Sequence, residues 1–167
     1  MKKKYEFVEC DTQSWNGRII RRIVAIRDFD DVKEGDLGGY IESESNLSQE
    51  DTCWIYDNAA VFGHAKVRGN AVVYGNAKVY GNAVVYGDAK VYGDAEVYGH
   101  TKVYGDAEVY GDAEVYGHAV VYGDAKVYGR AEVYGDAAVY DNAKVYGCAE
   151  VCGSAEIHGE AVIRGGA

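Results

Sequence analysis

Two histidines that stand eighteen residues apart, His100 and His118, are the residues best suited to acid–base chemistry in this sequence. Histidine changes its charge close to neutral pH, so a positioned imidazole can act as a general base. His64 and Asn82 precede them at the same interval. The series predicts that neighbouring imidazoles share one corner of a repeating structure, and it makes His100 and His118 the candidates for catalysis.

Carboxylates recur at the same interval of eighteen residues. Asp88, Asp106 and Asp124 form one series, and Asn70 and Asn142 flank it. Carboxylates that stand one strand apart must be solvated, protonated or shared with a cation. Because an exposed corner offers no closed cage of oxygen ligands, we expect these side chains to be solvated and to bind no metal.

The cysteines do not show the dense framework that small secreted domains use. They are Cys10, Cys53, Cys148 and Cys152. Cys148 and Cys152 are close enough for a metal pair, but no second pair has ligand spacing that would complete a zinc site. We therefore expect free thiols, and neither a metal nor another cofactor.

These residues are embedded in a six-residue repeat, Val-Tyr-Gly-Asp/Asn-Ala-x, that runs from Ile55 to the C-terminus. An aliphatic residue returns at every sixth position as far as Ile163, and alanine fills the fifth position everywhere except at Thr101. A glycine in each repeat disfavours helix, whereas Val and Tyr favour extended backbone. Each unit is too small to bury its own apolar side and must stack on copies of itself, which predicts a solenoid.

The spacing of an aliphatic residue and a small residue four positions later resembles the hexapeptide repeat of left-handed parallel β-helix proteins. The resemblance covers about two thirds of the chain. It implies an all-β, single-stranded left-handed parallel β-helix, a triangular solenoid with eighteen residues per coil. The family often has Gly or an acidic residue directly after the aliphatic residue, where this sequence has Tyr. In hexapeptide-repeat acyltransferases a histidine is the general base and acts between subunits, but neither His100 nor His118 matches that role residue by residue.

The first 40 residues do not follow the repeat. Two β-rich runs, Lys4–Glu9 and Arg18–Arg27, flank a segment that ends in Asn-Gly, a strong hairpin signal. We expect residues 1–40 to form an N-terminal β-hairpin cap, with apolar side chains such as Ile19 and Ile23 covering the open core. The β-helix then spans residues 41–167.

The segment after the cap reads as degenerate repeats that become regular from about residue 53. Leu47 and Cys53 fall on the alanine register. Residues 21–58 also resemble the opening of uncharacterised hexapeptide-repeat proteins of bacteria and their phages, through Gly-Asp-Leu-Gly-Gly-Tyr-Ile and Asn-Leu-Ser-Gln-Glu. That resemblance names relatives without giving a function.

Thirteen tyrosines from Tyr74 to Tyr146 follow the aliphatic residue at every sixth position. A narrow core of Val and Ala has no room for them, so we expect three outward ladders of stacked rings. The residue before each aliphatic position distinguishes three faces. The acidic face carries Lys78, Glu96, Glu114, Glu132 and Glu150, and the mixed face carries Val72, Lys90, Glu108, Lys126 and Lys144. The third face carries Lys66, Val84, Lys102, Val120 and Ala138 beside Tyr86, Tyr104, Tyr122 and Tyr140.

The chain has a formal net charge of −10, and its opening Met-Lys-Lys-Lys is followed by no long apolar run. We therefore expect a cytoplasmic protein without a membrane segment. Phosphate neutralisation needs Lys and Arg, so direct binding of nucleic acid is not expected either. An acidic rod can instead imitate nucleic acid and occupy a basic groove on another protein.

Three classes of function remain from the sequence. The first is a non-catalytic binding or assembly module that docks a protein partner or itself, which for a phage-encoded protein includes inhibition of a host protein. The alternatives are a hexapeptide-repeat acyltransferase and the acidic mimic of nucleic acid. We expect a dimer or trimer, formed through the third face because it is the least charged, or through the last coil at 160–167. Enzymatic activity is not favoured, because the repeats contain no long excursion that would wall a pocket.

Overall fold

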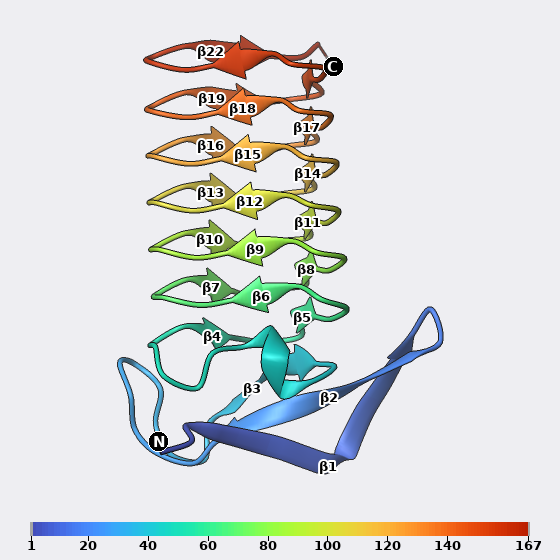
Figure 1. The fold of residues 1–167 in the computed structure, drawn as a ribbon, viewed down its shortest axis with the longest axis vertical. Helices are drawn as coiled ribbons and strands as arrows, with labels where there is room; N and C mark the ends of the chain where they lie inside the picture. The colour runs from blue at the N-terminus through green and yellow to red at the C-terminus, as the bar shows by residue number, and fades with distance from the viewer. Residues whose placement is uncertain (1, 167) are drawn as a thin grey trace.

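A computed structural model describes residues 2–166 as a hairpin-capped rod in which each coil adds one strand to each of three sheets (Figure 1). The acidic face is a nine-stranded sheet. Its strands are β1 (Tyr5–Trp15), β2 (Arg18–Ala25), β3 (Leu37–Ile41), β5 (Ala60–Val61), β8 (Lys78–Val79), β11 (Glu96–Val97), β14 (Glu114–Val115), β17 (Glu132–Val133) and β20 (Glu150–Val151).

The other two faces are parallel sheets of seven and six strands. The mixed face contains β4 (Trp54–Ile55), β7 (Val72–Val73), β10 (Lys90–Val91), β13 (Glu108–Val109), β16 (Lys126–Val127), β19 (Lys144–Tyr146) and β22 (Val162–Arg164). The third face contains β6 (Lys66–Val67), β9 (Val84–Val85), β12 (Lys102–Val103), β15 (Val120–Val121), β18 (Ala138–Val139) and β21 (Glu156–Ile157). One short 3-10 helix, η1 (Glu44–Asn46), precedes the regular coils.

The register between coils is eighteen residues throughout the regular rod. Val91 pairs with Val109, and Val103 pairs with Val121, in parallel ladders. The strands of successive coils lie directly above one another, and the coil is left-handed (Figure 1). These observations confirm the predicted left-handed parallel β-helix with coils of eighteen residues.

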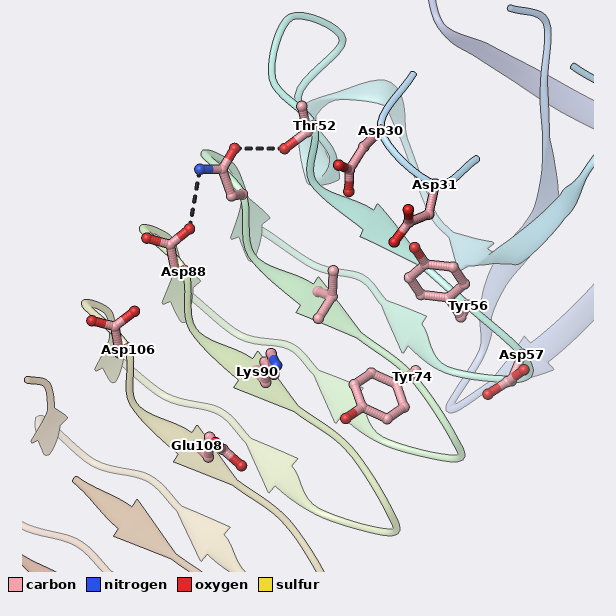
Figure 2. A pocket seen from close by; sticks show the side chains of 12 residues that line it. Asp30, Asp31, Thr52, Tyr56, Asp57, Tyr74, Asp88, Lys90, Asp106 and Glu108 are labelled. Atoms are coloured by element: carbon pink, nitrogen blue, oxygen red, sulfur yellow. Dashed lines mark hydrogen bonds between the residues drawn. The ribbon is translucent and has the colours of Figure 1, made fainter. Parts of the chain in front are cut away.

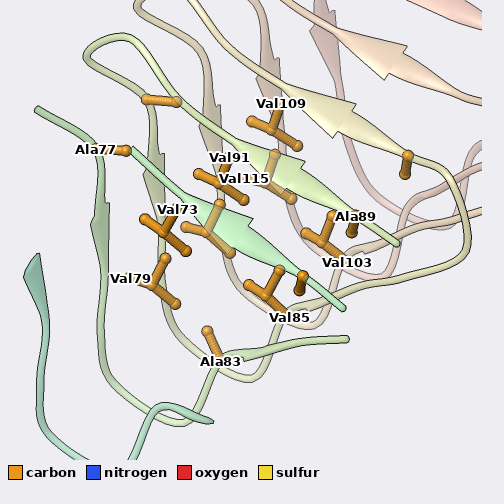
Figure 3. Close-up of a cluster of buried hydrophobic side chains, with 14 of the residues drawn as sticks. Val73, Ala77, Val79, Ala83, Val85, Ala89, Val91, Val103, Val109 and Val115 are labelled. Carbon is orange, nitrogen blue, oxygen red and sulfur yellow. The ribbon is translucent and has the colours of Figure 1, made fainter. Parts of the chain in front are cut away.

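The core of the rod is a column of Val and Ala side chains that converge from the three sheets (Figure 3). Val73, Val79 and Val85, one from each sheet, are fully buried, as are the alanines between them. Thr101 is the polar exception, and its hydroxyl donates a hydrogen bond of 2.8 Å to the carbonyl of Tyr98. The predicted inward positions are therefore confirmed as far as Val151, although Ala167 lies outside the described residues.

Glycine is required at the corners because the coils approach closely there in a left-handed backbone conformation. Gly105 has a φ of +70°, and a Cβ added to it would lie 2.9 Å from the backbone nitrogen of Gly123. Asp57 and Asp141 replace glycine at two corners, with φ values of 56° and 59°. Each compensates for the strain through its carboxylate, which accepts a hydrogen bond of 3.1 Å from the corner amide of the next coil.

The N-terminal hairpin is confirmed, and its first strand is longer than predicted. β1 and β2 are antiparallel and meet at Asn16 and Gly17, which both have positive φ, as a primed hairpin turn requires. β1 continues to Trp15 because the Asp11–Trp15 segment, expected to be a connection, pairs with the start of β2 beyond a register shift. β3 then pairs with β2 on one side and with β5 on the other, so the cap and the rod share one sheet.

The side chains that close the core differ in part from those predicted. Ile23 is buried as expected, but Ile19, which lies closer to the hairpin turn, is 52% exposed. The closure depends instead on Trp54, whose ring contacts Tyr5 edge-on at 6.2 Å and Phe29 at 5.2 Å between centroids. Aromatic rings cover the wide opening of the prism better than aliphatic side chains do.

Lys4 fastens the N-terminus to the first coil. The residue is fully buried, and its ammonium donates hydrogen bonds to the backbone carbonyls of Asp51 and Cys53. Burial lowers the pKa of Lys4 and raises the pKa of the Cys53 thiol, 3.5 Å from the ammonium nitrogen. Lys4 thus satisfies two carbonyl groups at the open edge of the solenoid.

The first coil is wider than the regular coils by two residues. Ile41 pairs with Val61 and Leu47 pairs with Val67, both at an interval of twenty, whereas Trp54 pairs with Val72 at eighteen. The additional residues lie between Leu47 and Trp54. The assignment of Leu47 to the alanine register is therefore wrong, because it occupies the valine column instead. Cys53 does precede its strand as an alanine would, and it is buried.

Candidate functional site

The histidine column forms as predicted, but at an exposed corner. The rings of His100 and His118 stack with centroids 4.9 Å apart and planes within 3°. Both side chains are exposed to solvent, and within residues 2–166 no hydrogen bond joins either imidazole to a carboxylate. A general base usually needs such a partner to fix its tautomer and orientation. His64 is exposed on an earlier coil of the same column.

The tyrosines form three continuous outward ladders. Successive rings are separated by 4.6 to 5.0 Å between centroids, and their planes are within 8° of parallel. Phe62 extends the ladder on the acidic face by stacking on Tyr80 at 5.0 Å. The tyrosines from 74 to 146 are all half-buried, because each ring covers the strand of a neighbouring coil while its edge faces solvent.

The like-charge ladder on the acidic face is confirmed by its register, since Glu96 pairs with Glu114 and Glu132 with Glu150. The structure adds that a tyrosine of the preceding coil donates a hydrogen bond to each glutamate. The bonds are Tyr80 to Glu96 at 2.8 Å, Tyr98 to Glu114 at 3.1 Å, Tyr116 to Glu132 at 3.0 Å and Tyr134 to Glu150 at 3.3 Å. Each phenol stabilises one carboxylate within the column of equal charges.

The phenol–carboxylate pairs change the acidity of the tyrosines. Partial burial and the hydrogen bond to Glu132 together raise the pKa of Tyr116 to about 12. Burial and the carboxylate of Glu96 likewise raise the pKa of Tyr80. Sequence reasoning missed these pairs, although a signal for them was present. A tyrosine followed by a glutamate sixteen residues later places the two side chains diagonally on adjacent coils.

The mixed face differs from the acidic face in its charges. Lys126 and Glu108 lie on adjacent strands with their charged atoms 3.9 Å apart. Tyr92 also donates a hydrogen bond of 2.8 Å to Glu108. The charges of this face are therefore partly compensated within the chain, as the sequence predicts.

The third face is assembled in the predicted register. Lys66, Val84, Lys102, Val120 and Ala138 stand in one column on successive strands. The tyrosine column beside them contains Tyr86, Tyr104, Tyr122 and Tyr140 in one continuous stack. At one end of that column the guanidinium of Arg68 covers the ring of Tyr86, at 4.9 Å from its centroid.

The aspartate column occupies another corner and joins an open groove. Asn70 accepts a hydrogen bond of 2.5 Å from Thr52 and donates one of 3.1 Å to Asp88, as Figure 2 shows. Asp88 and Asp106 line one side of a groove of about 890 Å³, and Asp30 and Asp31 of the cap loop line another. Asp124, on the next coil, is exposed at the same corner.

Tyr56 and Tyr74 lie in this groove, and their rings are perpendicular with centroids 6.4 Å apart (Figure 2). Sequence reasoning missed the groove because the cap loop that forms its far side has no repeat to fix its position. Within residues 2–166 no group of three or more His, Cys, Asp or Glu side chains is arranged to hold a metal ion.

The four cysteines are free thiols, and three of them are exposed. Burial sets Cys53 apart from the others. Between residues 2 and 166 no helix has the length and apolar character needed to cross a membrane.

Comparison with known proteins agrees with the fold. A family model described as "YdcK Beta solenoid repeat" matches residues 77–93. A 52-residue segment is 52% identical to a protein of Escherichia coli (strain K12) named "Uncharacterized acetyltransferase YdcK". The matched segment covers 30% of this chain and only 16% of that relative. The family model thus matches part of the regular repeat, and the segment shared with the relative leaves most of that relative unmatched.

Proposed function

Because the chain is a hexapeptide-repeat-like β-helix protein, we propose that its rod is a non-catalytic binding or assembly module. The observation that carries the proposal is the continuous outward stack of tyrosines on all three faces. Each tyrosine offers an apolar ring and a polar hydroxyl, and stacking makes the surface rigid. Protein interfaces favour such side chains because they lose little conformational freedom on binding. The module docks a protein partner or another copy of itself.

The distribution of charge supports a protein partner. The hydroxyls of Tyr98 and Tyr116 already bond to Glu114 and Glu132, so a docking surface on the acidic face is ordered before binding. A partner with a basic surface suits this face, and the proposal includes a host protein inhibited by a phage-encoded chain. Free thiols suit the reducing cytoplasm in which we place the module.

The acyltransferase is the second candidate, and the name of the Escherichia coli relative favours it. His100 and His118 are the residues that would act as general base. Their exposure at a convex corner, with no orienting carboxylate within residues 2–166, supports the binding module instead. The third candidate, a mimic of nucleic acid, is supported by the net charge of −10 and the glutamate ladder.

One experiment separates these candidates. Immobilised wild type, a Glu114→Lys/Glu132→Lys variant and a Lys144→Glu control are incubated with a lysate of the native source. The proposal expects a protein that binds the wild type and the control but not the acidic-face variant. If added DNA displaces this protein from the immobilised wild type, the chain acts as a mimic of nucleic acid.

Acetyl-thioester turnover is measured in parallel with small amine and hydroxyl acceptors. Turnover that the wild type shows and that His118→Ala loses, with an unchanged circular dichroism spectrum, would replace the binding module by an acyltransferase. A wild type that retains no protein from the lysate and does not self-associate in solution refutes the binding module.

A further inference from the structure

The cap leaves the three outer faces of the rod unequally accessible. On the acidic face, Trp15 at the hairpin tip lies against Phe62 with centroids 6.3 Å apart, and the ammonium of Lys78 lies 4.4 Å from the centre of the Trp15 ring. On the mixed face, the loop that carries Asp30 and Asp31 stands over the first coils and forms one side of the groove. Among the described residues, no cap segment covers the outer side of β6, β9 or the later strands of the third face.

The charges of the third face are opposite at its two ends. Its central column reads Lys66, Val84, Lys102, Val120, Ala138 and Glu156 from the first strand to the last. Lys66 and Glu156 are exposed, and neither takes part in a salt bridge within residues 2–166. Glu156 accepts one long hydrogen bond of 3.4 Å, from the hydroxyl of Tyr140. The face thus has an unpaired positive end, an apolar middle and a negative end.

We infer that the third face docks a second copy of this chain with the two rods antiparallel. A twofold axis that lies in the plane of the interface, at right angles to the rod, reverses the order of the coils and places each column against its own copy. The axis passes between Lys102 and Val120. Lys66 then faces Glu156 of the second copy at both ends, and Val84 faces Ala138 in between. This inference rests on the proposed function, because it names the partner of the assembly module.

The tyrosine column follows the same symmetry. Tyr86 faces Tyr140 of the second copy, and Tyr104 faces Tyr122, so eight rings from two chains meet between the charged ends. Val120 faces the aliphatic stem of Lys102, whose ammonium reaches the rim of the interface. Aromatic area leaves water while the charges at the ends find partners.

Parallel association is disfavoured by the same residues. A twofold axis along the rod exchanges the two columns of the face and keeps each coil opposite itself. Lys66 would then face Arg68 of the second copy at one end, and Glu156 would face His158 at the other, so the lysine and the glutamate would no longer pair with each other. Antiparallel self-association of the acidic face is disfavoured, because it would bring the Glu96–Glu150 columns of both chains together.

The test uses two charge reversals at the ends of the face and sedimentation of the intact chain at tens of micromolar. Wild type is expected to be a dimer. Lys66→Glu places two carboxylates opposite each other at each end, and Glu156→Lys places two ammonium groups there. Each variant alone is expected to weaken dimerisation by about tenfold or more. Lys144→Glu on the mixed face is the matched control and leaves the dimer unchanged.

An equimolar mixture of the two reversed variants distinguishes the register. In a mixed pair the two introduced charges, which are opposite in sign, meet at one end of the interface. At the other end the unchanged Glu156 of the first variant meets the unchanged Lys66 of the second. The heterodimer is therefore expected to regain wild-type affinity.

An unchanged circular dichroism spectrum of each variant shows that the exposed substitutions leave the fold intact. Failure of the mixture to associate, or tighter association of Lys66→Glu alone as a parallel pair would give, overturns the inference.

The antiparallel dimer and the non-catalytic function can be refuted independently of each other. A monomeric wild type refutes the antiparallel dimer, yet the binding module survives if a foreign protein is retained by the acidic face. A wild-type dimer that also shows acetyl-thioester turnover lost in His118→Ala refutes the non-catalytic function and leaves the dimer standing.

Discussion

Replacement of corner glycines by alanine separates two reasons for the glycine in every repeat. At Gly105 an added Cβ lies 2.9 Å from the nitrogen and 3.2 Å from the oxygen of Gly123, in a backbone with φ of +70°. At Gly153 the φ is +65°, but no atom lies within 4 Å of the added Cβ. Gly153→Ala therefore measures the left-handed backbone alone, at about 1–2 kcal/mol. Gly105→Ala adds a contact with backbone that cannot move without separating two coils, at about 1–3 kcal/mol more.

Equilibrium unfolding in guanidinium chloride, followed by circular dichroism, measures both changes against the wild type. The expected order is wild type, then Gly153→Ala, then Gly105→Ala as the least stable. Gly105→Asn serves as a further control, since asparagine tolerates the left-handed region better than alanine but keeps the Cβ. If Gly105→Ala and Gly153→Ala lose the same free energy, close approach of the coils is not a reason for the glycine, and the reasoning from corner packing is wrong.

Three further predictions follow from the core, the cap and the tyrosine–glutamate pairs. Val109→Asp should abolish cooperative unfolding, because a buried carboxylate without a partner costs several kcal/mol, while the outward Glu108→Asp should retain it in the same thermal scan. Lys4→Met should lower the free energy of unfolding by about 1–3 kcal/mol, since two backbone carbonyls lose their donor; an unchanged unfolding midpoint would contradict this. The pKa of Tyr116 is raised in the folded state to about 12, so its stabilising effect is present below pH 10 and is lost as pH rises from about 10 to 12. Glu132→Gln should lower that pKa in a spectroscopic titration of tyrosinate, and an unshifted titration would argue against the hydrogen bond.

The regular rod could be predicted from sequence because each repeat makes the same contacts with the coil before it and the coil after it. An inward Val at 91 implies an inward Val at 109. Once the inward and outward positions of one strand are assigned, those of every other repeat follow. The outward tyrosines followed from volume alone, because rings do not fit beside Val and Ala in a narrow prism. Three faces of different charge followed from the interval of eighteen.

The first 53 residues could be predicted only in outline because their contacts are not repeated. The Asn-Gly turn predicted the hairpin, but no local signal indicated how far β1 extends or that Ile19 is exposed. The placement of Leu47 was wrong because two additional residues follow it in the first coil, and a shift of register by that amount moves a side chain from one inward column to the other. The buried ammonium of Lys4 depends on a contact with Cys53 that is 49 residues distant.

The candidate site illustrates the difference between placing residues and assigning their role. The histidine, aspartate and glutamate columns all formed at the predicted interval, so sequence located them correctly. Their chemistry depends on the side chain that lies diagonally beside them on the adjacent coil, which the interval of eighteen does not describe. A glutamate such as Glu114 has a tyrosine hydroxyl sixteen residues earlier in the chain, whereas His100 and His118 stack on each other. A carboxylate bonded to a phenol is held in a fixed position, whereas within residues 2–166 no acid orients either imidazole. The interval of sixteen residues, searched beside the interval of eighteen, would find the ordered pairs in this sequence before its structure is known.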